Sequence, residues 1–520
     1  EHNYFSKTGQ AFNGEFRYVA SDASQGYVET SLLSEKASTG TVLGERPASR
    51  TTMVRGNVAQ QLPGRFRLGA SANYTSNITT RGLYDQDIAR ASNPSSTINA
   101  NLSGAIAGWQ IGAQYARNEV FSTETSSTLG GTSPRVNISS AEQPIGNLPI
   151  YWALNTDAVG ILDEGRKDET VVERNRYRAD ITPTIRAPLS KLAWLQLTTS
   201  LAWRGTWWSE RVDPETKDLI EEPITRNYFE LQANMVGPVF GRVFDTPGMG
   251  YAQRWKHVVE PSVSFARTTN IDESLRKSIV TGFDSVDTVV GSVTRVTYGL
   301  TNRLYAKRGE GAAAAAREVA ALSVSQSYYT DPFAAELDPN YRHPETNEPV
   351  SQNFSPVVMT LRASPTESSS VQFVVDYDSQ FDEVRKLRAE TTVRTGQLLD
   401  LSAGWSRQLV IEGLRGFSEN SSSHFLNARA ALRTQGNKYG ATYNFNYDIR
   451  RTGFTNQALQ AYYNAQCCGV GVEYATYNVP SFGGTAGKVL DRRFNLSFTL
   501  AGIGSFSDFF GAFGGDPYGR

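Results

Sequence analysis

Cysteine is rare in this chain, and its two copies, Cys467 and Cys468, are adjacent in a sequence of 520 residues. Neighbouring residues of a strand point to opposite faces, and their Cα atoms lie about 3.8 Å apart, below the roughly 4.4–6.8 Å range of disulfides. We therefore expect the two side chains to point apart and not to bond to each other. Two alternatives follow: free thiols in a reduced compartment, or bonds to cysteines outside this stretch. Metal binding is disfavoured because further cysteine or histidine ligands are missing nearby.

Other residue types that could perform chemistry form no recognisable site. The four histidines are scattered along the chain, at His2, His257, His343 and His424. None has a nearby carboxylate at a spacing typical of catalysis, and no GxSxG, HExxH or phosphate-binding glycine motif is present. We expect a protein that is not an enzyme and that needs no cofactor or metal, with a barrel lipase or protease as the alternative. The acidic segment 213–222 could bind divalent cations or could be a solvated loop.

The elements around the cysteine pair have one apolar and one polar face. Before the pair, residues 439–450 alternate aromatic or aliphatic side chains with polar ones, and residues 494–500 do the same after it. Side chains of a strand point alternately to its two faces, so each segment separates an apolar environment from a wet one. We predict that Tyr443, Phe445, Tyr447 and Phe498 face lipid.

This alternation recurs from one end of the chain to the other. Clear examples are residues 66–74, 109–115, 177–186, 195–204, 371–377 and 399–405. Such segments number roughly two dozen, each about as long as a membrane-barrel strand. Their polar faces carry Arg and Asp, which suit a water-filled lumen better than a soluble core.

The connections between these segments fall into two length classes. Short turns are expected at residues 187–191, 395–397 and 435–437, and long polar segments at 77–95, 207–225, 270–291, 331–352 and 411–424. A membrane barrel has short turns on one side and long loops on the other, whereas a soluble sandwich gives no reason for such segregation. The sequence thus predicts an all-β fold, with residues 1–520 forming one large antiparallel transmembrane β-barrel.

Charge and hydropathy narrow the class further. Lys and Arg total 51 against 52 Asp and Glu, so the balance gives no argument for a nucleic-acid partner. No run of about 18 apolar residues exists, which argues against helical membrane spans. The chain begins at Glu1 without a signal-peptide pattern, so we interpret it as mature or truncated. A soluble or surface β-repeat protein remains the alternative class.

Four stretches carry a resemblance to a known family. They are residues 13–18, residues 255–261 with an H-x-x-E-P pattern, residues 298–305, and Gln466-Cys467-Cys468 followed by Val470, Val472, Glu473 and Tyr474. Together they resemble the LptD (OstA/Imp) family of lipopolysaccharide-assembly barrels in the bacterial outer membrane. The similarity covers nearly the whole chain, and the Cys-Cys element is its distinctive part.

The resemblance implies an architecture and a set of partners. Family members have a periplasmic jelly roll before a barrel of about 26 strands, so we expect about 24–26 strands here, with the jelly roll and the first strand or so missing upstream. An LptE-like lipoprotein would plug the lumen, and the missing jelly roll would join a periplasmic Lpt bridge. The cargo would be lipopolysaccharide, and the alternative is a general porin or a plugged outer-membrane transporter of another family.

The same resemblance implies a route for the cargo. The polar sugar would pass through the lumen while lipid A leaves through a lateral seam between the first and last strands. Two routes are needed because a polar sugar is costly to place in the hydrocarbon of the membrane, and acyl chains are costly to place in a water-filled lumen. On the last-strand side, the seam residues would be Phe494, Asn495, Leu496, Ser497, Phe498, Thr499 and Leu500.

The resemblance also gives the cysteines a role. The turn before them, 464–466, is short and the next connection, 478–491, is long, which places Cys467 and Cys468 on the periplasmic side. Disulfides persist there, and the family's jelly roll presents cysteines of its own. The resemblance therefore implies interdomain disulfides whose partners lie outside these 520 residues.

Overall fold

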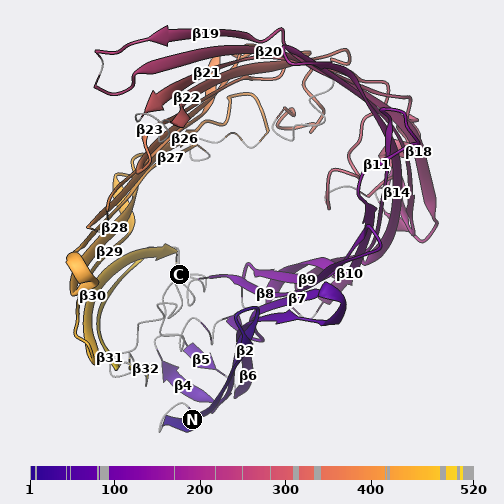
Figure 1. The fold of residues 1–520 in the computed structure, drawn as a ribbon. Helices are drawn as coiled ribbons and strands as arrows, with labels where there is room; N and C mark the ends of the chain where they lie inside the picture. Colours follow the sequence, from indigo (N-terminus) through magenta and orange to yellow (C-terminus); the bar gives the residue numbers. More distant parts are fainter. Residues whose placement is uncertain are drawn as a thin grey trace.

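The chain forms one large, curved antiparallel sheet, seen here in a computed structural model. The structure describes residues 2–506 apart from 6–8, 42–43, 47, 79–80, 82–92, 124, 169, 217, 249, 281–282, 309–314, 333–340, 397, 416, 418–421, 481–487 and 501–503. Within these residues the main sheet has 28 strands. Viewed along its axis, the sheet curves from β2 round to β31 as the wall of a barrel (Figure 1). The predicted large antiparallel barrel is confirmed.

The long strands form the wall of the barrel, and shorter strands pair with parts of them. The strands of the first half are β1 (His2–Phe5), β2 (Gly9–Ser21), β3 (Ser24–Glu35), β6 (Ser49–Gln61), β7 (Arg67–Thr75), β8 (Ser95–Ile106), β9 (Trp109–Phe121), β10 (Ser126–Ser140), β11 (Gln143–Pro144), β12 (Tyr151–Lys167), β13 (Thr170–Glu173), β14 (Arg176–Leu192), β15 (Leu195–Trp208), β18 (Ile224–Val236), β19 (Phe240–Asp245) and β20 (Arg254–Thr268). Those of the second half are β21 (Thr294–Arg308), β22 (Ala315–Tyr329), β23 (Val357–Thr366), β24 (Ser369–Asp378), β25 (Glu383–Thr395), β26 (Leu399–Gln408), β27 (Ser423–Arg433), β28 (Tyr439–Asp448), β29 (Gly453–Asn464), β30 (Cys468–Pro480), β31 (Lys488–Leu500) and β32 (Gly504–Phe506).

Small elements lie outside the main sheet. They are the two-stranded pairs β4 (Ser38–Thr41) with β5 (Gly44–Arg46) and β16 (Arg211–Val212) with β17 (Leu219–Ile220), the helix α3 (Glu273–Lys277), and the single 3₁₀ turns η1 (Pro63–Arg65) and η4 (Gln435–Asn437). No helix among the described residues is long and apolar enough to cross a membrane.

Strand β14 shows how the two faces of the wall differ. Tyr177 is 63% exposed and Ile185 49%, whereas the alternating Arg176, Arg178 and Asp180 are at most 5% exposed. A soluble protein would bury the apolar residues and expose the charges. The inverted pattern is that of a membrane barrel, whose outer face is apolar and whose lumen is polar.

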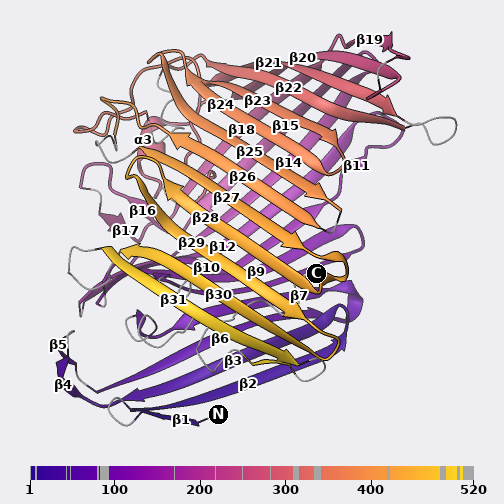
Figure 2. The same ribbon diagram turned by 90° about the vertical axis from the view of Figure 1, so that its left-hand side faces the viewer.

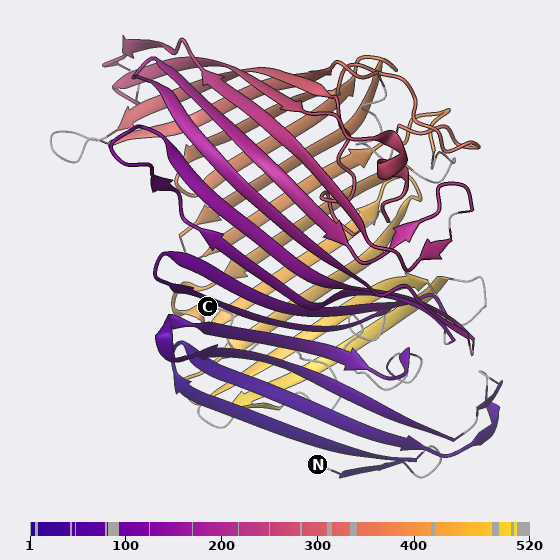
Figure 3. The ribbon, with the colours of Figure 1, turned by 90° about the vertical axis from the view of Figure 1, so that its right-hand side faces the viewer.

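The two ends of the wall carry different connections. Because consecutive long strands are antiparallel, alternate connections lie at the same end, and all five predicted long segments share one end. Figures 2 and 3 show α3 at that end, with β16 and β17 beside it. The turns 193–194, 396–398 and 434–438 lie at the other end, which also carries the longer connections that hold β11 and β19.

Two expected connections differ from the structure. Residues 187–191 are not a turn: they belong to β14, which continues to Leu192 through a register shift between Pro188 and Ser190. Proline is tolerated there because an irregular ladder position needs no N–H donor. The long connection expected at 478–491 is also wrong, since β30 continues to Pro480 and β31 begins at Lys488.

Candidate functional site

A cluster of buried charges on the inner face of the wall surrounds Arg178. Its guanidinium donates to Asp284 at 2.7 Å and to Asp287 at 2.9 Å, and it lies 3.4 Å from a carboxylate oxygen of Asp157 on β12. The side chains of Arg178 and Asp287 are fully buried. Asp284 and Asp287 belong to the connection 269–293, so this long segment folds into the barrel and contacts the wall.

Further contacts hold the same segment against the wall. The indole N–H of Trp208 donates to Asp287 at 3.0 Å, and Arg226 donates to the carbonyl oxygen of Val286 at 2.5 Å. The guanidinium of Arg226 lies 5.0 Å from the ring of Trp208, a cation–π distance. Three neighbouring strands, β14, β15 and β18, therefore converge on residues 284–287.

The surroundings of Asp284 in the docked segment favour its ionised form. Burial raises the pKa of Asp284, but the hydrogen bonds and positive charge of Arg178 outweigh it, so the pKa lies below its ordinary value. Beside this cluster, Arg204 donates to both oxygens of Asp180, and the Thr206 hydroxyl donates to Asp180 at 2.7 Å. Fixed charge pairs of this kind hold a surface in place and offer no nucleophile or acid–base pair for catalysis.

The alternation in residues 177–186 predicts Arg178 on the polar face, but nothing in the sequence brings it together with the external segment. Arg178 and Asp284 are 106 positions apart. The available signal was the pair of aspartates in 284–287, which has no special meaning until the loop is known to enter the lumen. Two carboxylates of the acidic segment 213–222 already have partners nearby. Glu222 accepts a hydrogen bond from Arg211, and Asp213 accepts from backbone N–H groups.

The two edges of the sheet lie at β2 and β31. Every long strand between them has a partner on both sides, whereas no pairing joins β1, β2 or β3 to β30, β31 or β32 among the described residues. The short strand β1 pairs with residues 9–12 of β2, and β32 pairs with residues 498–500 of β31. The middle of each edge has no ladder partner in the described part of the chain.

The predicted seam residues lie in β31, which is followed by β32 and so is not the last strand. Phe494 is 64% exposed and Phe498 is also exposed, whereas Asn495 and Ser497 are buried on the opposite face. This alternation agrees with an apolar outer and a polar inner face. Thr499 and Leu500 are in the same strand, but their side chains lie outside the described set.

The cysteines lie at the turn between β29 and β30, at the end of the wall with the short turns. Cys467 is in the turn, closed by a hydrogen bond from the Ala465 N–H to the Cys468 carbonyl oxygen at 2.7 Å. Both thiols are free and their Sγ atoms lie 3.2 Å apart, too far for a bond of about 2.05 Å. The expectation that they point apart is wrong, because the turn, not a strand, sets the direction of Cys467.

Within the residues that the structure describes, no group of three or more His, Cys, Asp or Glu side chains could hold a metal ion.

One family model and several solved structures match the chain. The family model described as "LptD: LPS transport system D" matches residues 49–413. No curated protein matches the chain. Among solved structures, the FrpB iron transporter from Neisseria meningitidis (F3-3 variant) has a TM-score of 0.41 and 11% identity, covering 95% of this chain and 79% of that chain. The outer-membrane alcaligin receptor FauA from Bordetella pertussis has a TM-score of 0.38 and 12% identity, covering 97% and 76%.

Proposed function

Because this chain belongs to the LptD family and is a β-barrel of the bacterial outer membrane, we propose that it inserts lipopolysaccharide into the outer leaflet. The polar sugar passes through the lumen, and the lipid part leaves sideways between the two edges of the sheet. No covalent chemistry is involved, and the protein is not an enzyme. The route follows from cost: sugar is expensive to place in hydrocarbon, and acyl chains are expensive to expose to water.

The family match over residues 49–413 carries this proposal, and the two edges of the sheet support the lateral route. In a closed barrel every strand has two partners, which removes the edges altogether. Here β2 and β31 each have a long stretch of backbone with no partner among the described residues. Exposed Phe16 on β2 and Phe494 on β31 lie along these stretches and would contact departing acyl chains.

The inner face supports the passage of a polar, anionic sugar. A hollow of about 410 Å³ at β25 to β27 is lined by Lys386, Arg388, Glu390, Ser406 and Asn427, among others. Cationic side chains in such a position attract phosphate groups, and serine and asparagine bind sugar hydroxyls. We also propose that an LptE-like lipoprotein occupies the lumen and that a periplasmic jelly roll upstream of this sequence connects the barrel to the Lpt bridge.

Photocrosslinking tests the lateral route. A photoreactive phenylalanine analogue at Phe494 should crosslink to lipopolysaccharide in living cells. The matched control is Leu322 on β22, which is 40% exposed on the outer face and lies far from both edges. Equal crosslinking at Leu322 and Phe494 would overturn the route, because contact with bulk outer-leaflet lipid would then explain both.

Depletion tests the function itself. Cells depleted of the protein should lose surface lipopolysaccharide, and the purified barrel should carry a lipoprotein. Surface lipopolysaccharide that stays unchanged after depletion would contradict the proposal.

A further inference from the structure

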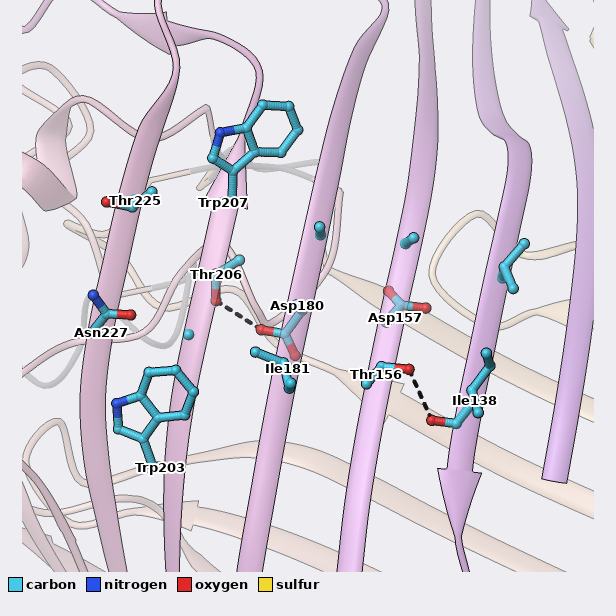
Figure 4. A pocket seen from close by; sticks show the side chains of 14 residues that line it. Ile138, Thr156, Asp157, Asp180, Ile181, Trp203, Thr206, Trp207, Thr225 and Asn227 are labelled. Atoms are coloured by element: carbon cyan, nitrogen blue, oxygen red, sulfur yellow. Dashed lines mark hydrogen bonds between the residues drawn. The ribbon is translucent and has the colours of Figure 1, made fainter. Parts of the chain in front are cut away.

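A hollow of about 440 Å³ lies across strands β10, β12, β14, β15 and β18 (Figure 4). It crosses two rows of neighbouring residues. One row runs from Ile138 through Thr156, Ile181 and Gly205 to Asn227, and the other from Val136 through Ala158, Ala179 and Trp207 to Thr225. Its volume lies within the roughly 300–1,000 Å³ of small-molecule sites.

The hollow opens on the outer face of the wall. Trp208 and Thr206 point inward, since Trp208 contacts Asp287 of the docked segment and Thr206 contacts Asp180. Side chains alternate along a strand, so Trp207 and Gly205 point outward. Trp207 and Ile181 are accordingly exposed. Asp157 and Asp180 do not present their carboxylates to the hollow, because these carboxylates pair with Arg135 and Arg204.

Small residues create the hollow within a band of large ones. Ala158 and Ala179 are neighbours in one row and Gly205 lies in the other, where the outer face elsewhere presents exposed residues such as Ile185, Leu201 and Leu231. A Cβ at Gly205 would lie 2.7 Å from the ring of Trp203, so any larger residue there would displace this ring. The floor is therefore uncharged and apolar, and Trp203 forms one side.

Polar groups mark one end of the hollow. Asn227 and Thr225 are exposed, and neither side chain has a hydrogen-bond partner in the described part of the chain. Both lie near the start of β18, at the same end of the wall as Trp207 and the long connections. Tryptophan at the end of a barrel strand is typical of the membrane interface.

We propose that this hollow is a binding site for one acyl chain of an outer-leaflet lipid, separate from the sheet edges. The chain lies over Ala158, Ala179 and Gly205, and the amide or ester at its polar end meets Asn227 and Thr225. The occupant is a lipid because the hollow is continuous with the apolar outer face, which is the interface of an outer-membrane barrel with lipid. The site does not depend on the transport proposal.

Native mass spectrometry of the purified, delipidated barrel tests the site, with dipalmitoyl phosphatidylethanolamine as the probe. Filling the hollow by Ala179→Leu should weaken retention of the first lipid by about tenfold or more, because a change of even one methylene in a hydrophobic pocket is worth about 10–200-fold. The control is Ala233→Leu, an identical change on the outer face of β18 outside the lining. Asn227→Ala should give a smaller loss.

Two results would overturn the site. One is equal lipid retention by Ala179→Leu and Ala233→Leu, which would mean that lipid binds anywhere on the outer face. The other is retention by the wild-type protein that follows a random distribution of adducts. A variant that fails to fold is recognised by loss of the barrel's resistance to unfolding in detergent, in which case Ala158→Val, a smaller filling change, replaces it and must show the same weakening.

Discussion

At the level of single residues, Arg178 joins the wall of the barrel to an external segment. It is buried and shares three aspartates from two different parts of the chain. A buried cation of this kind contributes less through attraction than through the penalty that its partners suffer when it is removed. Among the described residues, its loss would leave Asp287 buried with the indole N–H of Trp208 as its one side-chain donor.

Replacement of Arg178 should therefore release the segment 284–287. We expect Arg178→Ala to cost about 3–5 kcal/mol of docking free energy, because breaking one side of a buried ion pair leaves uncompensated charge. Arg186→Ala is the control, since its bond to Glu142 is exposed and such pairs contribute about 1 kcal/mol at most. Hydrogen exchange of residues 283–287 measures the difference, and similar protection in both variants would contradict it.

The pKa of Asp284 gives the docking a predictable pH dependence. Because this pKa is below the ordinary value of 3.8, its stabilising contribution is fully present above that value and is lost as pH falls through the lower folded pKa. Protection of residues 283–287, corrected for intrinsic exchange, should stay constant from about pH 8 to about pH 5 and fall only in stronger acid. Asp284→Asn should weaken docking and remove its part of this transition.

The cysteines lead to a prediction about oxidation. Their place at the end with the short turns is the periplasmic end of an outer-membrane barrel, where disulfides persist. We expect full-length protein to show a reductant-sensitive shift on a gel, and this 520-residue chain alone to yield both thiols free by mass spectrometry. Recovery of a Cys467–Cys468 bridge from native protein would contradict the proposal of interdomain bonds.

At the level of elements, alternation alone was enough to predict most strands and both faces. In β14 the predicted inward Arg178 and outward Tyr177 are where the period of two puts them. The period could not predict the end of β14, because Ala187-Pro188 reads as a turn when the register shift beside it is unknown. Nor could it predict that an external segment enters the lumen, since that contact depends on residues more than a hundred positions away.

Strand β28 provides a direct test of the two faces. Phe445 lies on the aromatic face, 5.7 Å from the ring of Phe454, whereas Asn446 bonds to Asn456 on the other face. Phe445→Arg should cost about 2–4 kcal/mol because it places a charge in the bilayer, and Asn446→Arg should be tolerated in a wet lumen. Refolding titrations in detergent or lipid that ranked the two variants the other way round would show the face assignment to be wrong.

At the level of the whole molecule, the alternation of apolar and polar side chains along each strand gives the barrel a polar interior and an apolar exterior. The external segment docked on β14, β15 and β18 lies against one side of the interior, and the sheet edges lie elsewhere on the wall (Figure 1). The anchored loop and the proposed exit are thus separate parts of the barrel. The hollow at Ala179 is a third separate feature of the barrel, on its outer face.

The linear order of the strands has a consequence for folding. Each long strand pairs with its neighbours in sequence, so every contact of the wall joins strands that follow one another along the chain, and hairpins can add one after another. The two edge strands, β2 and β31, come from opposite ends of the chain, so bringing their edges together carries the largest loop-closure entropy. We expect the two edges to be the least protected part of the wall, so amide exchange at residues 13–19 and 490–497 should be faster than at β14 and β15.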